Sequence, residues 1–520
     1  MVLSRRNALG LLAAAPGLRL AQAQGQDAKP EIAKGAFAGT SESLKPVAAP
    51  EWFRDAKFGI WAHWGPQSQT EAGDWYAKRM YEEGSKQYQF HLKTYGHPSK
   101  FGFKDIIPTW KAEQFDAEHL MDLYQKAGAK YFVSMGVHHD NFDLWNSKFN
   151  RWNSVNMGPK KDVVGMFQKA AQKRGLKFGV SEHLAVSYHW YQTSHLSDKE
   201  GPQKGVPYDG ANKQFWDYYH EGHEVPMRPG STRTDDWSPV NVPLKWKQHY
   251  FNRIKDLVDN YHPDLLYTDG PIFFEEWGLS LIAHLYNESA KKNKGKVDAV
   301  YCSKLNRQIN GVLAGILDVE RGLLDKIADQ PWQTDTCIGG WHYNREIKYK
   351  SAKTVVDLLV DIVSRNGNLL LNFPLPGSGV LDGEELKTLD GITKWMAVNH
   401  EGIYGSRPWK MFGDGPGTGA SAQGGGNFNE RNRKDLSPQD ARFTTKGSTL
   451  YAFVMGVPDK EALIPALAPG GANNVGRIRN VELVGFKGKV KFTQDAAGLK
   501  VELPETKPCE HALTFKIVGA

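Results

Sequence analysis

Short apolar runs alternate with helical patterns from about residue 52 to about residue 399. Residues 367–373 (GNLLLNF) are one such run, and residues 162–175 carry apolar side chains at helical spacing. Strand–helix alternation of this length is typical of a parallel sheet and predicts a (β/α)8 TIM-like barrel with insertions. A doubly wound open sheet is the alternative, but no glycine-rich phosphate loop follows the first strand.

The pattern changes after the alternating region. We expect the barrel to span residues 46–400, with a long insertion at 186–240 that lines a site. Residues 401–520 contain short strands separated by turn signals, which predicts an antiparallel β-sandwich. The glycine-rich stretch 414–428 lacks a Gly-Lys-Ser/Thr sequence, so we interpret it as a loop rather than a phosphate cradle.

The first 23 residues have the pattern of an export signal. Arg5 and Arg6 precede an apolar stretch at residues 8–18, and residues 21–23 form an Ala-x-Ala cleavage site. Paired arginines favour the twin-arginine route, with an ordinary secretory signal as the alternative. We therefore expect a periplasmic or secreted protein, and a flexible linker at residues 24–45.

Composition excludes several classes of partner. Removing the three arginines of the first 23 residues lowers the formal net charge from +7 to +4, which is too small and too scattered for nucleic acid binding. After the signal, no apolar run reaches the ~18 residues of a membrane helix. Three cysteines are too few for a disulfide framework and lack zinc-binding spacing. The sequence is compatible with an oligomer.

Polar and aromatic side chains follow several of the predicted strands. In a parallel barrel, the catalytic residues lie at these carboxyl ends of the strands. Asp269, for example, ends the predicted strand 264–269, whose apolar run is 265–267, although Asp-Gly after a strand is also ordinary turn chemistry. The candidate site residues are His63, Asp74, Trp75, His138, His139, Glu182, His183, Asp269, Glu320 and Trp332. Histidines, indoles and carboxylates with few positive charges favour a neutral polyhydroxy ligand.

Four stretches closely resemble glycoside hydrolase family 29, the retaining α-L-fucosidases. They are WFRDAKFGIWAHWGPQS (52–68), HHDNFDLWNSKFNRWNSVNMGPKKDVVG (138–165), YHPDLLYTDG (261–270) and SRNGNLLLNFP (364–374). The resemblance covers roughly residues 50–410. It implies a barrel followed by a β-sandwich, an exo-acting retaining hydrolase, a fucosylated oligosaccharide or polysaccharide as substrate, and no cofactor or metal.

The resemblance also implies residue roles. Asp269 matches the family's nucleophile, and the family's fucose-binding residues correspond to His63, His138, His139 and Trp75. Asp74 stands where the family has Glu and is shorter by one methylene group. The contact that this Glu makes with a hydroxyl of the sugar would therefore have to form in another way. The family's paired tyrosines are Ser181 and Glu182 here, and Glu182 or His183 would take over their contact.

The general acid/base residue is assigned less directly. Many relatives have Glu after the tryptophan that corresponds to Trp332, but this chain has Gln333, and an amide cannot exchange a proton at a useful pKa. A second family location falls at Glu320, which we predict to be the acid/base. The alternative is a structural carboxylate paired with Arg321, in which case Asp318 or Glu182 would act instead.

Three other functions remain open from the sequence. The first is a metal-dependent barrel hydrolase that uses His138, His139, Asp140 and Asp269. The second is a non-catalytic fucose-binding protein, suggested by the missing Glu at position 333. The third keeps the chemistry but cleaves α-L-galactosides, since the two sugars differ by one hydroxyl group.

Overall fold

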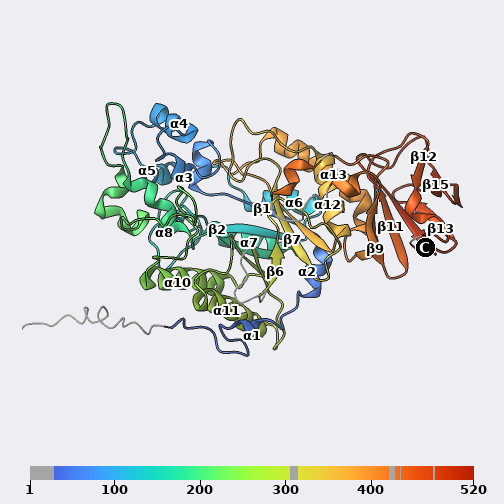
Figure 1. The fold of residues 1–520 in the computed structure, drawn as a ribbon, viewed down its shortest axis with the longest axis horizontal. Helices are drawn as coiled ribbons and strands as arrows, with labels where there is room; N and C mark the ends of the chain where they lie inside the picture. The colour runs from blue at the N-terminus through green and yellow to red at the C-terminus, as the bar shows by residue number, and fades with distance from the viewer. Residues whose placement is uncertain are drawn as a thin grey trace, which may run out of the picture.

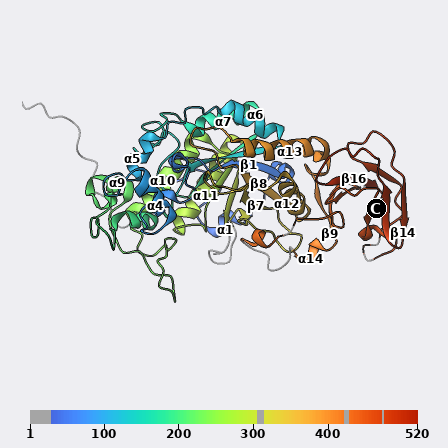
Figure 2. The same cartoon turned by 90° about the horizontal axis from the view of Figure 1, so that it is seen from above.

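The computed structural model describes residues 29–304, 314–420, 428–433, 435–471, 473 and 475–519. The expected export signal at residues 1–23 lies outside the described residues. Figures 1 and 2 show the barrel in the middle of an elongated molecule, with the C-terminal strands at one end.

Eight parallel strands form a closed barrel in sequence order. They are β1 (Phe58–Ala62), β2 (Tyr131–Val137), β3 (Lys177–Glu182), β4 (Leu265–Thr268), β5 (Val300–Lys304), β6 (Ile316–Asp318), β7 (Trp332–Cys337) and β8 (Gly367–Asn372). Strand β8 closes the barrel by pairing with β1, with Leu370 opposite Gly59. The predicted barrel is confirmed, and the open-sheet alternative is wrong.

The main helices beside the barrel are α6 (Ala117–Lys126), α7 (Val163–Lys173), α10 (Leu244–Tyr261), α11 (Glu276–Lys292), α12 (Ala352–Ser364) and α13 (Gly383–Asn399). Helix α7 begins after Asp162, whose carboxylate accepts a hydrogen bond from the Gly165 amide and caps the helix. Residues 319–331, between β6 and β7, form turns and bends instead of a helix. Within the described part of the chain, no helix combines the length and the apolar character needed to cross a membrane.

The insertion between β3 and α10 forms short helices at the end of the molecule opposite the C-terminal strands (Figures 1 and 2). Its elements include α8 (Ser187–Trp190) and α9 (Trp216–Tyr219). It is packed through aromatic rings and hydroxyls, as where the Tyr191 and Tyr218 hydroxyls lie 2.9 Å apart. The buried aromatic residues of this segment belong to the same hydrophobic core as the barrel.

Two antiparallel sheets follow the barrel. Their strands are β9 (Arg407–Asp414), β10 (Ala441–Lys446), β11 (Thr449–Val454), β12 (Glu461–Ile464), β13 (Asn480–Leu483), β14 (Phe492–Asp495), β15 (Gly498–Glu502) and β16 (Leu513–Val518). One sheet has the order β13-β16-β11-β10-β9 and the other β12-β15-β14. Apolar side chains from both sheets, such as Phe515 and Val501, share one core. The expected β-sandwich is therefore confirmed.

A buried charge cluster joins the two parts of the chain. Asp361 of α12 accepts a 2.5 Å hydrogen bond from Nε of Arg442 in β10 and lies 2.8 Å from Arg365. Burial acts to raise the pKa of Asp361, but the surrounding guanidinium groups hold it below its ordinary value. The ionised carboxylate thus links the barrel to the sandwich.

The expected flexible linker at 24–45 is wrong for its described residues. The amides of Ala33 and Phe37 donate to side chains of α11, His284 and Asn287. The Phe37 ring also packs edge-on against Tyr286. These contacts hold the segment on the outside of the barrel, because its few apolar residues find a partner there.

Candidate active site

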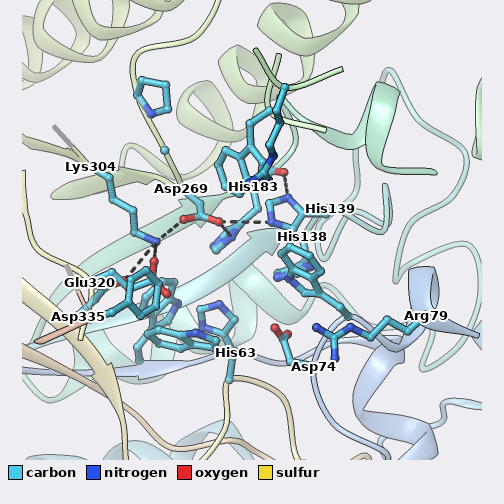
Figure 3. Close-up of a pocket in the computed structure, with 18 residues that line it drawn as sticks. His63, Asp74, Arg79, His138, His139, His183, Asp269, Lys304, Glu320 and Asp335 are labelled. Atoms are coloured by element: carbon cyan, nitrogen blue, oxygen red, sulfur yellow. Dashed lines mark hydrogen bonds and ion pairs between the residues drawn. The ribbon is translucent and has the colours of Figure 1, made fainter. Parts of the chain in front are cut away.

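A cavity of about 600 Å³ opens at the carboxyl ends of the barrel strands (Figure 3). It is lined by Trp61, His63, Asp74, Trp75, Arg79, His138, His139, His183, Arg228, Trp237, Asp269, Gly270, Pro271, Lys304, Glu320, Asp335, Trp341 and Phe428. Eight of the ten residues singled out from the sequence are among them. Arg228 and Trp237 come from the segment 186–240.

Asp269 follows β4 directly and is 8% exposed. Its amide donates to the Glu182 carbonyl, 3.0 Å away, which extends the pairing of β4 with β3 by one residue. Gly270 has φ +124°, and a Cβ there would approach Trp237 to 2.7 Å. Glycine is therefore required for the chain to turn away while the Asp269 carboxylate stays in the cavity.

One ammonium group joins two carboxylates. Nζ of Lys304, the last residue of β5, donates to Oδ1 of Asp269 and, at 2.6 Å, to Oε2 of Glu320. Figure 3 shows the lysine between the two acids. Two oxygens bonded to one nitrogen lie within about 6 Å of each other.

The two carboxyl groups differ in proton affinity. Burial acts to raise the pKa of Asp269, but the Lys304 ammonium and the His183 ring outweigh burial and hold that pKa well below its ordinary value. Burial raises the pKa of Glu320 to about 7, although Lys304 acts in the opposite direction. One acid is therefore ionised at neutral pH while the other can carry a proton, which is how acid and base roles are separated in a catalytic pair.

Two histidines present unpartnered nitrogen atoms. Nδ1 of His183 lies 3.0 Å from Oδ2 of Asp269, whereas its Nε2 is buried and has no hydrogen-bond partner among the residues that the structure describes. Within the same described residues, His63 Nδ1 is also buried and unpartnered. Burial lowers the pKa of His183 to about 4 and that of His63 well below its ordinary value, so both rings are neutral. A neutral ring nitrogen of this kind can accept a hydrogen bond from a ligand hydroxyl.

The adjacent histidines follow β2. His139 Nδ1 lies 2.6 Å from the His183 carbonyl and donates to it, while its Nε2 lies 3.3 Å from Oδ2 of Asp269. His138 Nδ1 lies 3.0 Å from the amide nitrogen of Gln67, and burial lowers its pKa. Both rings therefore line the cavity in orientations fixed by neighbouring groups.

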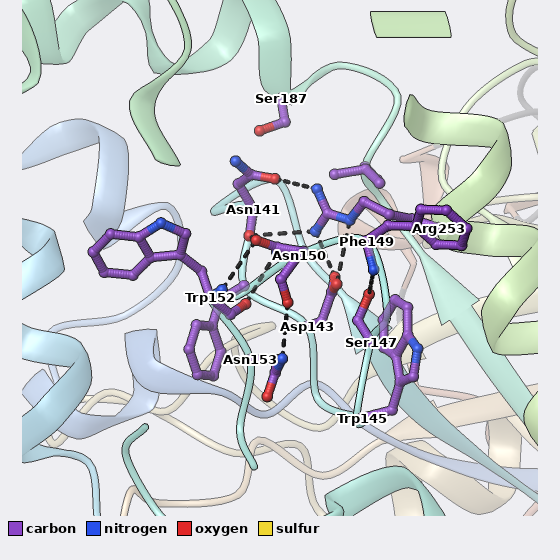
Figure 4. Close-up of polar contacts among 12 residues, drawn as sticks. Asn141, Asp143, Trp145, Ser147, Phe149, Asn150, Trp152, Asn153, Ser187 and Arg253 are labelled. Carbon is purple, nitrogen blue, oxygen red and sulfur yellow. Dashed lines mark hydrogen bonds and ion pairs between the residues drawn. The ribbon is translucent and has the colours of Figure 1, made fainter. Parts of the chain in front are cut away.

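The segment after these histidines is held by a buried ion pair (Figure 4). The Arg253 guanidinium of α10 contacts both carboxylate oxygens of Asp143, with Nη2 2.5 Å from Oδ1, and donates to Oδ1 of Asn141 at 2.5 Å. Both Arg253 and Asp143 are fully buried. The polar residues of the 138–165 stretch therefore serve to fix the turn that carries the histidines.

The opposite wall combines a carboxylate with aromatic rings. Asp74 Oδ1 accepts a 2.7 Å hydrogen bond from Nδ1 of His342, and Trp75 lies edge-on to His139. Trp341 packs against His63, with ring centroids 4.9 Å apart. Flat apolar rings beside hydrogen-bonding groups suit a ligand with both hydroxyls and an apolar face.

The histidines could also hold a metal ion. Among the described residues, three groups have ligand atoms within 4.8 Å of one another: His63, His138 and His183; Asp74, His138 and His342; and His139, His183 and Asp269. Asp140, which the metal-dependent alternative requires, belongs to none of these groups in the described chain.

A family model described as Alpha-L-fucosidase matches residues 24–401, and a model described as Alpha-L-fucosidase C-terminal domain matches residues 433–518. The chain belongs to the α-L-fucosidase family. The tissue α-L-fucosidase of Rattus norvegicus is 28% identical over 495 residues, which cover 91% of each chain. The plasma α-L-fucosidase of Homo sapiens is 28% identical over 389 residues, covering 73% of this chain and 74% of that protein.

Solved structures of fucosidases share the architecture. The α-fucosidase of Thermotoga maritima in complex with fucose superposes with a TM-score of 0.70 at 23% identity, covering 93% of this chain and 100% of that chain. A GH29 α-L-fucosidase from Bacteroides thetaiotaomicron gives 0.60 at 18% identity, covering 94% and 99%. At these identities the likeness is one of fold alone.

Two of the sequence predictions for this fucosidase site are wrong. Glu182 is fully buried and points away from the cavity, where its carboxylate accepts hydrogen bonds from the Tyr250 hydroxyl and the Leu184 amide. Side chains alternate along a strand, so the next residue, His183, faces the cavity instead. Trp332 begins β7 at the other end of the barrel, and its indole N–H donates to the Arg365 carbonyl.

The position of Trp332 also changes the meaning of Gln333. That amide is fully buried, donates to Oδ2 of Asp318 and accepts from the Tyr131 hydroxyl. Neither Gln333 nor the fallback acid Asp318 is among the described residues that line the cavity. The missing Glu at 333 is therefore no sign of a lost acid, which was the observation behind the non-catalytic alternative.

Three cavity residues with polar or aromatic side chains that sequence reasoning did not find are Lys304, Asp335 and Trp341. Trp341 comes shortly after β7 and is followed by His342, which contacts Asp74, and an aromatic residue beside a histidine at that place was a usable signal. Lys304 and Asp335 lie in strands β5 and β7, where nothing local distinguishes them. Their roles depend on which strands are neighbours in the closed barrel.

Proposed function

We propose that this glycoside hydrolase removes terminal α-L-fucose from glycans with retention of anomeric configuration. Asp269 is the nucleophile and Glu320 the general acid/base. The observation that carries the proposal is the contact of both carboxylates with Lys304, because it keeps their oxygens within about 6 Å. Retaining glycosidases have carboxyl groups about 5–5.5 Å apart, whereas inverting enzymes need about 6.5–9.5 Å to admit water.

In the first step an oxygen of Asp269 bonds to the anomeric carbon and the glycosidic C–O bond breaks. Glu320 gives its proton to the departing oxygen, so the leaving group departs as an alcohol. The resulting glycosyl ester is attacked by water, and Glu320 takes the water's proton back. Asp269 is released as a carboxylate and the enzyme returns to its starting state.

The proton states support these assignments. Asp269 is ionised and can attack, because Lys304 and His183 stabilise its charge. Glu320, with a pKa of about 7, can both give and regain a proton near neutral pH. The unpartnered nitrogens of His63 and His183 supply acceptors for the hydroxyls of the bound sugar.

The sequence also supports a site of action outside the cytoplasm. The Arg5-Arg6 pair and the apolar stretch that follows match a twin-arginine export signal. A terminal sugar on an extracellular or periplasmic glycan would therefore be the substrate.

The test compares two leaving groups. With an aryl α-L-fucoside whose phenol is strongly acidic, Glu320→Ala should lose little of the first step, because that phenolate leaves without a proton. With a fucosyl oligosaccharide, the same variant should lose about 10²–10⁴-fold in kcat/KM. Asp269→Ala should lose activity on both substrates, and azide should restore part of it by replacing the missing nucleophile.

Glu320→Ala with unchanged turnover of the oligosaccharide would exclude Glu320 as the acid/base. Wild-type protein that cleaves no α-L-fucoside but cleaves an α-L-galactoside would assign the site to the other sugar.

A further inference from the structure

We infer that Phe428, from the loop between β9 and β10, forms the subsite for the leaving group, and that it takes a sugar ring by stacking. The inference rests on the proposed function, because it takes Glu320 as the acid. It concerns Phe428, the last residue of the glycine-rich stretch and one to which the barrel chemistry gives no role.

Phe428 lines the catalytic cavity although it belongs to the second domain. Its side chain is 49% exposed, which is unusual for a phenylalanine beside a buried site. Its φ is +61°, a left-handed conformation that bulky residues rarely adopt. An exposed aromatic residue held in a costly conformation at a cavity is a candidate for ligand contact.

The residues at and after Phe428 are fixed to the barrel. The Phe428 amide donates to the Glu320 carbonyl at 2.7 Å, and the Glu430 amide donates to the Arg321 carbonyl at 2.9 Å. Asn429 makes two further hydrogen bonds, accepting from the Leu323 amide and donating to the Leu323 carbonyl, each at 3.0 Å.

Glu430 adds side-chain contacts to this attachment. Its carboxylate accepts a 2.5 Å hydrogen bond from the Thr336 hydroxyl and lies 2.6 Å from Nζ of Lys350. Residues 428–430 are therefore anchored along the segment that carries Glu320, and the Phe428 ring has a defined place beside the cavity.

The direct contact with Glu320 indicates which part of the substrate meets the ring. In Figure 3, Glu320 and Lys304 lie on one side of Asp269, and His138 and His139 lie on the other. The glycosidic oxygen must face Glu320 to receive its proton. The group attached to that oxygen therefore passes the Glu320 side of the cavity, where Phe428 is attached.

The chemistry of the ring defines the ligand class. A phenyl ring has no hydrogen-bonding group, so it selects by apolar contact with a flat face. A pyranose ring offers such a face through its C–H groups, and an aryl group offers one as well. Fluoride or a methoxyl group offers none, so fucosides with those leaving groups should not depend on Phe428.

The experiment measures kcat/KM of Phe428→Ala, Phe428→Leu and Phe428→Trp on α-L-fucosyl fluoride and on a fucosyl oligosaccharide. We expect Phe428→Ala to lose about five- to ten-fold on the oligosaccharide and nothing on the fluoride. Phe428→Trp should restore the loss, and Phe428→Leu should restore little of it. The inhibition constant of free L-fucose should be the same in all variants, because fucose occupies only the histidine side.

Phe149→Ala is the matched control, because Phe149 is 47% exposed and lines a different cavity, beside Trp216. It should leave both substrates unchanged. An equal loss on both substrates in Phe428→Ala would overturn the inference, since it would mean that the change disturbs the fucose side of the cavity. An aryl α-L-fucoside with a strongly acidic phenol separates stacking from the positioning of Glu320, because its ring can stack on Phe428 but its phenolate leaves without a proton. We expect Phe428→Ala to lose activity on this aryl fucoside as well, and a loss confined to the oligosaccharide would overturn the inference. Unchanged hydrolysis of the oligosaccharide would overturn it too. Wild-type protein inactive on every fucoside would instead reject the proposed function.

Discussion

Nζ of Lys304 lies 2.6 Å from Oε2 of Glu320, and the same nitrogen also contacts Asp269. The lysine is buried, and although burial acts to lower its pKa, the two carboxylates hold that pKa well above its ordinary value. A permanent positive charge therefore lies between the proposed nucleophile and the proposed acid/base, and it favours the ionised form of both.

Replacing Lys304 by Met should move the whole pH–activity profile to higher pH. Loss of the ammonium group raises the pKa of Asp269, so the acidic limb moves up, and it raises the pKa of Glu320, so the basic limb moves up as well. Each limb should shift by about one to three pH units, the usual effect of an adjacent charge. Lys304→Arg keeps the charge and is the control. A profile that is unchanged in Lys304→Met would show that the lysine does not set these proton affinities.

The wild-type protein should lose activity as pH rises through about 7. Glu320 has a pKa of about 7 in the free enzyme, and it must be protonated to assist the leaving group. The basic limb of kcat/KM against pH, measured with a poor leaving group, reports this ionisation. In Glu320→Gln the residual activity should lack that limb. A basic limb that persists in Glu320→Gln would point to another group.

The sequence predicted much of the site because its chemistry lies in contiguous stretches. Asp269 ends an apolar strand, and His138 with His139 ends another, so the closure of the barrel was enough to bring them together. Glu320 was reached only through the resemblance to the family. Local pattern alone did not distinguish it from Asp318, which lies two residues earlier and is fully buried.

The features that the sequence did not predict depend on which face of a strand each side chain occupies and on contacts between residues far apart in the chain. Trp332 was taken as a strand end, but β7 is a polar strand, so no apolar run marked where it begins. Glu182 and His183 could not be separated without knowing which of two alternating positions faces inward. Phe428 lies more than a hundred residues beyond Glu320 in the chain, and nothing before folding connects them.

Replacing Arg253 by Met should lower the free energy of unfolding by about 3–5 kcal/mol, because Asp143 would be left as an unpaired buried carboxylate. The measurement is urea denaturation followed by tryptophan fluorescence. Arg151→Met breaks an ion pair with Asp217 whose side chains are exposed, and it should cost about 0–1 kcal/mol. Equal losses in the two variants would mean that the buried pair does not hold the histidine segment.

Chelation should leave turnover unchanged, because the proposed mechanism uses only carboxylates. Added Zn²⁺ should inhibit in competition with L-fucose, since three nitrogen ligands of His63, His138 and His183 lie within 4.8 Å of one another. Steady-state assays with EDTA, and with Zn²⁺ at several fucose concentrations, check both statements. Activity that EDTA abolishes and Zn²⁺ restores would revive the metal-dependent alternative.

The stereochemistry of the first product tests most directly the claim that Asp269 and Glu320 act as a closely spaced pair. Proton NMR during early hydrolysis of an aryl α-L-fucoside resolves the two anomers before they interconvert. The proposed double displacement predicts that α-L-fucose forms first and the β anomer appears only later, by mutarotation. Initial release of β-L-fucose would contradict the account, because it requires water, rather than Asp269, to attack the anomeric carbon.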